Sequence, residues 1–267
     1  MRNNKPLIFI TNDDSIYAKG IEALIEMVRP IGDLFVVAST ESQSCMSHAV
    51  TLKNPLRAHK MREEKGLVVY GCNGTPVDCV KLGLSELVTS RPSLLLSGIN
   101  HGANSSINAV YSGTVAAAAE GIFYCVPSIA FSLCSHSSDA DFSGSIAYGR
   151  KIVEQTLNKG LPENICLNVN FPKLPLERIE GIRLCRQNRG AWAESIERRI
   201  DPHNREYYWL DGGYVNHEPE STDTDEAALA SGYISVVPLH FDYTAYEALN
   251  YMKTNWSDFE KESKITQ

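Results

Sequence analysis

Four apolar residues run directly into two adjacent carboxylates in the stretch Leu7-Ile8-Phe9-Ile10-Thr11-Asn12-Asp13-Asp14-Ser15. So short an apolar run suits a strand that is buried on both faces better than an isolated helix. In an open parallel sheet, ligands bind just beyond the carboxyl ends of the strands. Two neighbouring carboxylates at such an edge repel each other, and a divalent cation relieves the repulsion. An Asx turn that leads into a helix explains the same residues equally well.

The residues that follow predict a strand–helix–strand unit. Apolar residues recur with helical spacing from Ile21 to Val28, and Pro30 and Gly32 end this helix. A second apolar run, residues 34–38, leads into the polar segment 39–44. The crossover between parallel strands places both strand ends on the same side of the sheet. We therefore expect Ser44 to approach the two carboxylates.

Strands and helices continue to alternate up to about residue 172. Further short apolar runs occupy residues 67–70, 94–96, 127–133 and 165–169, with helical patterns between them. This alternation predicts an α/β fold with a Rossmann-like, doubly wound, mostly parallel sheet. The strand 94–96 is expected to end in a polar loop that carries Asn100 and continues to residue 111.

The remainder, from about residue 173 to residue 267, changes character. Six arginines lie between residues 183 and 205, and Tyr207-Tyr208-Trp209 follows them. This composition predicts an antiparallel hairpin, either a subunit contact or a solvated hairpin. Residues 234–237 predict a last buried strand, and residues 244–261 a helix with Tyr246, Leu249 and Trp256 on its inner side. We interpret residues 1–267 as a single domain in which this part extends the α/β core.

Composition excludes several classes of protein. The 267 residues carry a net charge of −7, which argues against a stable complex with nucleic acid. No apolar stretch approaches the length of a membrane span, and residues 1–6 do not resemble a signal peptide. The seven cysteines include no C-x-x-C pair, which indicates reduced thiols rather than a zinc site. A cytoplasmic protein is the expectation.

The polar strand ends suggest chemistry on a phosphate ester. Asp13, Asp14, Ser44 and Asn100 offer only oxygen ligands, the kind that Mg²⁺ or Mn²⁺ prefers. Residues 112–114 precede an alanine-rich helix. The free backbone N–H groups at its start either bind an anion or are capped in the ordinary way by the side chain of Ser112 or Thr114. A cation beside an anion site suits phosphate hydrolysis by a metal-activated water, with Asp13 or Asp14 accepting its proton.

Several segments carry a family resemblance. Residues 7–20 resemble an opening that reads roughly T/S-N-D-D-G-x-x-A-P-G-I, and the segments Ser97–Asn104 and Tyr111–Gly121 match a second block almost letter for letter. Residues 74–80 and 222–225 also fit. Together they resemble the SurE (survival protein E) family of 5'/3'-nucleotidases, over nearly the whole chain.

This resemblance implies the fold, the substrate and the roles of individual residues. One divalent metal ion per subunit would be held by Asp13, Asp14, Ser44 and Asn100. Nucleoside monophosphates are the implied substrates. The implied assembly is a homodimer or homotetramer whose C-terminal segments are exchanged between subunits. The substrate or phosphate contacts that it implies come from Asn12, Asn104, Ser112, Gly113 and Thr114.

The chain departs from the family pattern in its loops. Ser15, Cys45 and Ser106 stand where glycine is usual, and Lys19 stands where proline is usual. Since none of these is a proposed metal ligand, the departures bear on the shape of the pocket and on substrate preference. We interpret Lys19 as a solvated side chain rather than a phosphate contact.

Three further residues have open roles. His48 and His101 lie in site loops and are either packing residues or acids for the leaving group, the first being favoured. Asp223 belongs to a D-x-D pattern but follows no apolar strand, so it is interpreted as part of a structural loop.

Other classes of protein remain as alternatives. A receiver-like signalling module also holds Mg²⁺ after its first strand, but it requires an acceptor aspartate and a lysine at later strand ends. A dinucleotide-dependent oxidoreductase lacks support because no G-x-G-x-x-G follows the first strand. A non-catalytic nucleotide-binding protein on the same fold stays open, because fold does not determine function.

Overall fold

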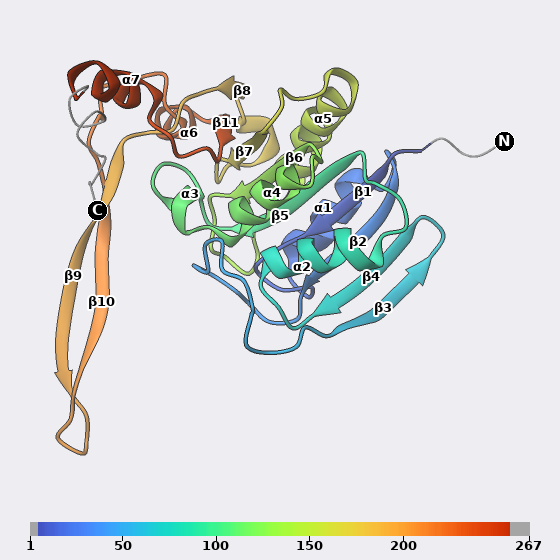
Figure 1. Ribbon diagram of the computed structural model, residues 1–267, viewed down its shortest axis with the longest axis horizontal. Helices are drawn as coiled ribbons and strands as arrows, with labels where there is room; N and C mark the ends of the chain where they lie inside the picture. Colours follow the sequence, from blue (N-terminus) through green and yellow to red (C-terminus); the bar gives the residue numbers. More distant parts are fainter. Residues whose placement is uncertain (1–4, 257–267) are drawn as a thin grey trace, which may run out of the picture.

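The computed structural model describes residues 5–256, and a nine-stranded sheet forms its centre (Figure 1). The strands lie in the order β3-β4-β2-β1-β5-β6-β7-β11-β8. Only β3 against β4 and β11 against β7 pair antiparallel within this sheet. The six central parallel strands are β1 (Leu7–Thr11), β2 (Asp33–Ser39), β4 (Leu67–Cys72), β5 (Leu94–His101), β6 (Ser128–Leu133) and β7 (Ile165–Phe171).

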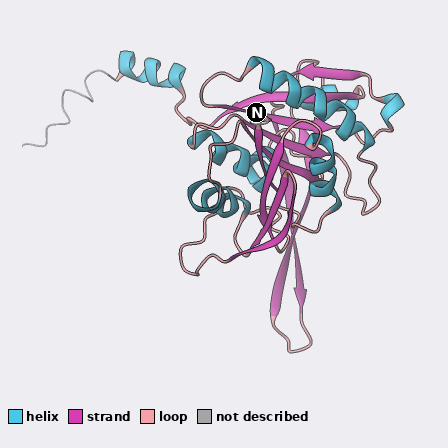
Figure 2. Ribbon diagram, turned by 90° about the vertical axis from the view of Figure 1, so that its right-hand side faces the viewer, coloured by secondary structure: helices cyan, strands magenta, loops and turns pink. Residues whose placement is uncertain are grey.

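Helices cover both faces of the sheet (Figures 1 and 2). On one face, α1 (Lys19–Val28) and α5 (Ser143–Lys159) bury an apolar core that includes Met27 and Phe171. On the other face, α2 (Pro76–Leu82), which continues as a π-helical turn (Gly83–Leu87), and α4 (Gly113–Phe123) pack over Phe9. The predicted doubly wound, mostly parallel α/β fold is therefore confirmed.

The first strand lies where the winding of the sheet reverses direction. β2 and β4 lie on one side of β1, whereas β5, β6 and β7 follow on the other. Such a reversal leaves an open crevice at the carboxyl ends of the strands. Helix α1 begins very close to β5 at this edge, and a Cβ on Gly20 would collide with the carbonyl oxygen of Ile99. Glycine is therefore required there.

Some elements differ from the sequence-based expectation. β5 does not end at residue 96 but continues through Asn100 to His101, with an irregular register between Ser97 and Asn100. β3 (Ala58–Glu64) was not expected, because its sequence is charged and nearly every residue is exposed at the edge of the sheet. Short helices also form at α3 (Asn108–Tyr111), at the 3₁₀ turn Leu176–Arg178 and at α6 (Asp225–Ala230).

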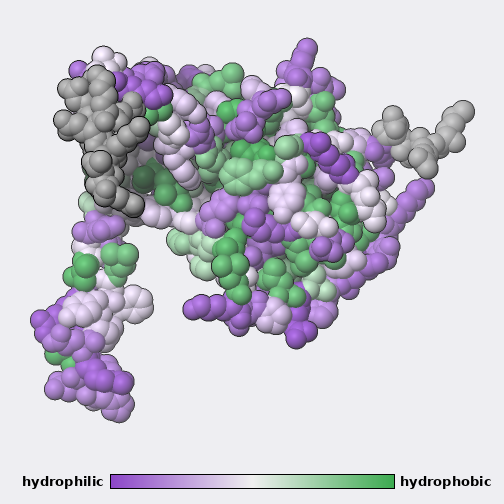
Figure 3. Space-filling view, in the orientation of Figure 1, coloured by the Kyte–Doolittle hydropathy of each residue, from purple (hydrophilic) through white to green (hydrophobic). Residues whose placement is uncertain are grey.

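The C-terminal part contributes two more strands to the sheet and a separate ribbon. β8 (Gly181–Leu184) and β11 (Tyr233–His240) join the large sheet. β9 (Gly190–Ile200) and β10 (Glu206–Asn216) pair antiparallel and project from the body, which confirms the predicted hairpin (Figure 1). Apolar side chains lie among polar ones along this hairpin (Figure 3).

The last described helix, α7 (Tyr246–Asn255), has no buried face. Tyr246, Leu249 and Trp256 are 59%, 37% and 51% exposed, so the prediction that they point inward is wrong for this chain. Among residues 5–256, none of the side chains of this helix is buried. Residues 257–261 of the predicted helix lie outside the described residues. Within residues 5–256, none of the helices has the length and apolar character needed to cross a membrane.

Candidate functional site

The start of helix α4 faces the carboxylate of Asp13. This carboxylate follows β1 directly and is almost fully buried. The Thr114 hydroxyl donates to Oδ1 at 2.5 Å, and the Thr114 backbone N–H donates to Oδ2 at 3.2 Å. A Cβ on Gly113 would lie 3.2 Å from Asp13, so a larger residue would crowd this contact. The helix N-terminus thus already stabilises one anion, which belongs to the protein itself.

Asp14 connects the end of β1 to the end of β5. Its Oδ2 accepts a hydrogen bond from the backbone N–H of His101 at 2.8 Å, and the His101 ring packs edge-on against Phe142. Asn100 precedes His101 and donates through Nδ2 to the carbonyl of Gly102 at 2.8 Å. Among the described residues, the Asn100 Oδ1 accepts no hydrogen bond and is available as a ligand. Asp14 and Asn100 are therefore brought to the same edge, as predicted.

Ser44 reaches this edge but is not in contact with the carboxylates. It lies exposed in the loop after β2, and its hydroxyl is 3.2 Å from that of Ser42. The backbone N–H of the preceding Gln43 donates to the Asp13 carbonyl at 2.7 Å. The loop is thus anchored one residue away from Ser44, whose side chain faces solvent.

Burial raises the pKa of both site carboxyls. It raises the pKa of Asp13 to about 6, the charge of Asp14 adds to this rise, and the hydrogen bonds from Thr114 offset it in part. Burial also raises the pKa of Asp14. The hydrogen bond from the His101 N–H and the nearby charges of His101 and His136 lower this pKa and offset part of the rise. Two carboxyls that resist ionising together are held as carboxylates more easily when a cation binds between them.

The residues at this edge fit a hard cation by their chemistry. Within residues 5–256, no group of three or more His, Cys, Asp or Glu side chains is placed to hold a metal ion. The predicted set contains only two carboxylates, completed by a hydroxyl and an amide oxygen. Such a set suits Mg²⁺ or Mn²⁺, which use few carboxylates and retain water, and does not suit zinc.

Three buried side-chain atoms near the same edge have no hydrogen-bond partner among the described residues. Asn12 donates through Nδ2 to the carbonyl of Ser15 at 2.7 Å, and its buried Oδ1 has no partner among the described residues. The hydroxyls of Thr11 and Ser97 are also unpartnered. Buried polar atoms normally find a partner, so these three require a water, a cation or a ligand group. In this placement, the Nδ2 of Asn12 bonds within the protein and its Oδ1 is the unpartnered atom.

The other predicted phosphate residues already have partners within the protein. The Ser112 hydroxyl accepts from the backbone N–H of Val115 at 3.1 Å, which confirms that Ser112 is the N-cap of α4. Asn104 is buried and donates through Nδ2 to the Ser132 hydroxyl at 2.8 Å. Asn168 and Asn170 bond its backbone. Ser112 retains a hydroxyl proton to donate, whereas the Asn104 amide belongs to a network at the ends of β6 and β7.

A buried ion cluster was not expected from the sequence. The Glu120 side chain is only 4% exposed and lies 2.8 Å from His48 Nε2 and 2.6 Å from Lys81 Nζ. Burial raises the pKa of Glu120, but the hydrogen bonds from His48 and Lys81 together outweigh it, so the net pKa lies below its usual value. His48 therefore fastens the loop that carries Ser44 to helix α4. A glutamate on a helix gives no sequence signal for such a role.

Two interpretations from the sequence agree with the structure. Lys19 is exposed and pairs with the exposed Asp139 at 3.2 Å, as expected for a solvated lysine. Asp223 bonds Arg186 on the surface at 2.9 Å, and Thr224 caps the short helix α6. The D-x-D pattern therefore has a structural role.

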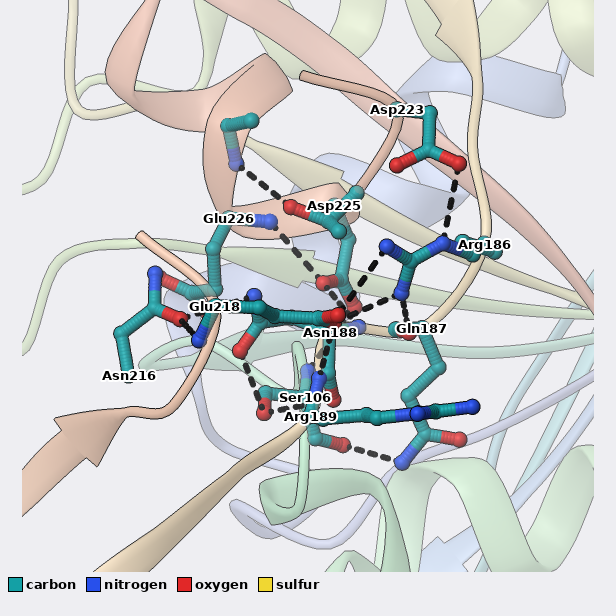
Figure 4. Close-up of polar contacts among 12 residues, drawn as sticks. Ser106, Arg186, Gln187, Asn188, Arg189, Asn216, Glu218, Asp223, Asp225 and Glu226 are labelled. Atoms are coloured by element: carbon teal, nitrogen blue, oxygen red, sulfur yellow. Dashed lines mark hydrogen bonds and ion pairs between the residues drawn. The ribbon is translucent and has the colours of Figure 1, made fainter. Parts of the chain in front are cut away.

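The second aspartate of this pattern, Asp225, has a role that the sequence did not predict. It is fully buried and accepts backbone N–H groups from Ser106 at 2.8 Å and from Asn188 at 2.9 Å (Figure 4). Burial raises its pKa, and these hydrogen bonds oppose the rise. Asp225 thus ties the loop after β5 to the root of the hairpin.

Comparison with known proteins identifies the family of this chain. The profile of the family described as Survival protein SurE matches residues 8–194. The chain belongs to the SurE family. The 5'-nucleotidase SurE of Phocaeicola vulgatus is 48% identical over 257 residues, 96% of this chain and 99% of that protein. The 5'-nucleotidase SurE of Caldanaerobacter subterraneus is 41% identical over 248 residues, 92% of this chain and 95% of that protein.

A solved SurE structure shares the fold. The crystal structure of the SurE protein from Aquifex aeolicus has a TM-score of 0.81 and 36% sequence identity, and the match covers 93% of this chain and 99% of that one. The Rossmann-like α/β architecture and the family resemblance found in the sequence are both confirmed.

Proposed function

We propose that this SurE chain is a 5'-nucleotidase, a phosphoric monoester hydrolase that releases phosphate from nucleoside monophosphates. Relatives that carry this name match nearly the whole chain. The observation that carries the proposal is the pair Asp13 and Asp14 at the switch point of the sheet, directly opposite the start of helix α4. A cation site beside helix N–H groups is what phosphate hydrolysis requires.

In this proposal, Asp13, Asp14, Ser44 and Asn100 hold one divalent cation, Mg²⁺ or Mn²⁺. When bound, the cation supplies positive charge to the phosphoryl oxygens and lowers the pKa of a water. The raised pKa of both carboxyls and the unpartnered oxygens nearby support this assignment. The exposed Ser44 turns toward the carboxylates when it acts as a ligand.

The proposed reaction assigns orientation of the water, acceptance of its proton and phosphate binding to particular side chains of the site. Asp13 and Asp14 orient the attacking water and accept its proton, and Thr114 fixes the orientation of the Asp13 carboxylate through two hydrogen bonds. The Ser112 hydroxyl and the Gly113 backbone N–H donate to the phosphate, whereas Thr114 acts on it mainly through Asp13. We assign Asn12 and Asn104 to substrate contacts on the basis of the family resemblance, in addition to their observed partners.

The proposal includes an assembly and a location. We infer a homodimer or homotetramer in which C-terminal segments are exchanged, because the hairpin and α7 expose large apolar side chains. These include Ile196, Tyr208, Trp209, Leu210, Tyr246 and Tyr251. The cytoplasmic location stays a prediction, with which seven cysteines free of disulfides agree. The interpretation of the whole chain as one domain, in which β8 and β11 extend the core sheet, belongs to the same proposal.

Phosphate release from a panel of 5'- and 3'-nucleoside monophosphates tests the function. The wild type is assayed with Mg²⁺, with Mn²⁺ and with EDTA, beside Asp13→Asn. We expect metal-dependent release that the substitution abolishes. A folded wild type that binds metal or nucleotide but releases no phosphate would instead support the receiver-like or nucleotide-binding alternatives.

A further inference from the structure

A cavity of about 340 Å³ lies at the root of the β9–β10 hairpin. Ile107 belongs to the loop that also carries Asn104, and the single turn of α3 separates it from Ser112. The cavity is therefore close along the chain to the proposed phosphate site, and it is large enough for part of a small ligand. Its lining residues are Ile107, Gln187, Asn188, Arg189, Gly190 and His217.

The wall of this cavity is fixed by hydrogen bonds from both sides (Figure 4). Asp225 holds the backbone of Ser106 and of Asn188. The Ser106 hydroxyl donates to the Asn188 carbonyl at 3.0 Å. The Tyr214 hydroxyl lies 2.6 Å from Asn188 Oδ1 and 2.9 Å from the Ser106 hydroxyl. A wall held in this way before binding can select among ligands, because little order is lost when one binds.

Ser106 contributes to this wall through its side chain. It adopts a positive φ of 52°, a backbone conformation that favours glycine. A glycine would fit the backbone without strain, but it would lack the hydroxyl that bonds Asn188. The serine therefore accepts an unfavourable backbone conformation in a position where its side chain fastens the lining segment 187–189.

The cavity lining offers a ligand one hydrogen-bond acceptor and one set of donors that have no partner within the described residues. Gln187 donates through Nε2 to the Ser106 carbonyl at 2.7 Å, which leaves its Oε1 as an acceptor. The Arg189 guanidinium makes no hydrogen bond within the described residues. Its neighbour Glu218 is held by Arg186 through two contacts, at 2.6 and 3.1 Å, and by the Arg189 backbone N–H. Arg189 lines the cavity and is exposed, so its planar set of donors is available to a ligand, and Ile107 is the apolar part of the lining.

We propose that this cavity is the nucleobase subsite and that it favours 6-oxopurines. A guanidinium pairs bidentately with the O6 and N7 acceptors of guanine, whereas adenine offers one acceptor and one donor on that edge. The apolar side chain of Ile107 offers a surface for the face of the base. The Gln187 oxygen accepts from a ring or exocyclic N–H. This inference rests on the proposed function and adds the substrate class of the same site.

The test compares three proteins on four substrates. Wild type, Arg189→Met and the control Arg178→Met, an exposed arginine outside the cavity, are assayed with GMP, AMP, CMP and p-nitrophenyl phosphate. We expect Arg189→Met to raise KM for GMP by about tenfold, the scale of one bidentate base contact. Its kcat on GMP and its activity on p-nitrophenyl phosphate should stay near the wild-type values. The Arg178→Met control should leave all four substrates unchanged.

Several results would overturn the subsite. One is an unchanged KM for GMP in Arg189→Met, and another is an equal loss on GMP and p-nitrophenyl phosphate. A wild type that prefers AMP or CMP to GMP would also contradict it. Calorimetric binding of GMP separates this failure from failure of the proposed function, because it needs no turnover. If the wild type hydrolyses nothing, weaker GMP binding by Arg189→Met still supports the subsite, and unchanged or absent binding refutes it. Arg189→Lys, which keeps the charge but not the planar fork, should recover less than half of the lost GMP affinity.

Discussion

Replacing Asp13 with asparagine is expected to stabilise the metal-free protein at neutral pH while it abolishes phosphate release. Asparagine has the same shape as aspartate, and Thr114 can adapt to it. The Thr114 backbone N–H would donate to the amide oxygen, and the Thr114 hydroxyl oxygen would accept from the amide NH₂ group. The substitution therefore removes a charge without breaking the contact to helix α4.

The size of the effect follows from the raised pKa of Asp13. In the folded protein the pKa is about 6, against 3.8 for the ordinary group, mainly because of burial and of Asp14. The folded state thus binds the proton more tightly, and the stabilisation is complete below pH 3.8 and is lost as the pH rises through 6. A pKa difference of about 2 corresponds to about 3 kcal/mol. The charged carboxylate costs the wild type this amount at pH 8, and about half of it at pH 5.

Urea unfolding in EDTA at pH 8 and pH 5, at one protomer concentration, measures this difference. Asp13→Asn should be more stable than wild type by about 3 kcal/mol at pH 8 and by about half as much at pH 5. At pH 8 this corresponds to a melting temperature higher by about 6–12 °C. Mn²⁺ should then stabilise the wild type and leave the variant unchanged. The control Asp139→Asn, at an exposed carboxylate, should stay within about 0.5 kcal/mol of wild type. A variant less stable than wild type at pH 8, or a gain that is equal at both pH values, would refute the reasoning.

Three further substitutions test separate parts of the molecule. Ser44→Ala should leave stability unchanged, because the side chain is exposed, and lower Mn²⁺ affinity by about tenfold in calorimetry; an unchanged affinity would remove Ser44 from the ligand set. Glu120→Gln should lower the free energy of unfolding by about 1 kcal/mol at pH 8, a modest value because Lys81 and His48 are partly exposed. Since the pKa of Glu120 is lowered on folding, this loss should fade as the pH falls below 4.5, and a pH-independent loss in urea unfolding would contradict it. Trp209→Ser should shift the protein toward a smaller species in light scattering after gel filtration, and an unchanged mass would place the hairpin outside the subunit contact.

The fold was predictable where burial leaves a continuous apolar run in the sequence. Residues 7–10 and 94–96 are buried on both faces of the sheet, and both runs were recognised as strands. β3 lies at the edge with its side chains in solvent, so it needs no apolar residues and gives no such run. The second half of β5 was assigned to a loop because Ser97, Gly98 and Asn100 are polar or small, although Ser97 and Asn100 pair with β6. The pattern of α7 was misleading because apolar spacing indicates a buried face without saying which chain buries it.

The sequence predicted the site only where its residues are close together in the chain or follow neighbouring strands of the sheet. Asp13 and Asp14 were found because a strand end and a charge repulsion are local features. The partner of Asp13 lies 101 residues further along the chain, and the sequence assigned Thr114 to the substrate instead. A helix N-terminus attracts the nearest anion, and here a carboxylate on the adjacent strand reaches it. The structure therefore gives this helix start a partner within the protein, because Thr114 holds the Asp13 carboxylate. The phosphate contacts of Ser112, Gly113 and Thr114 stay a prediction.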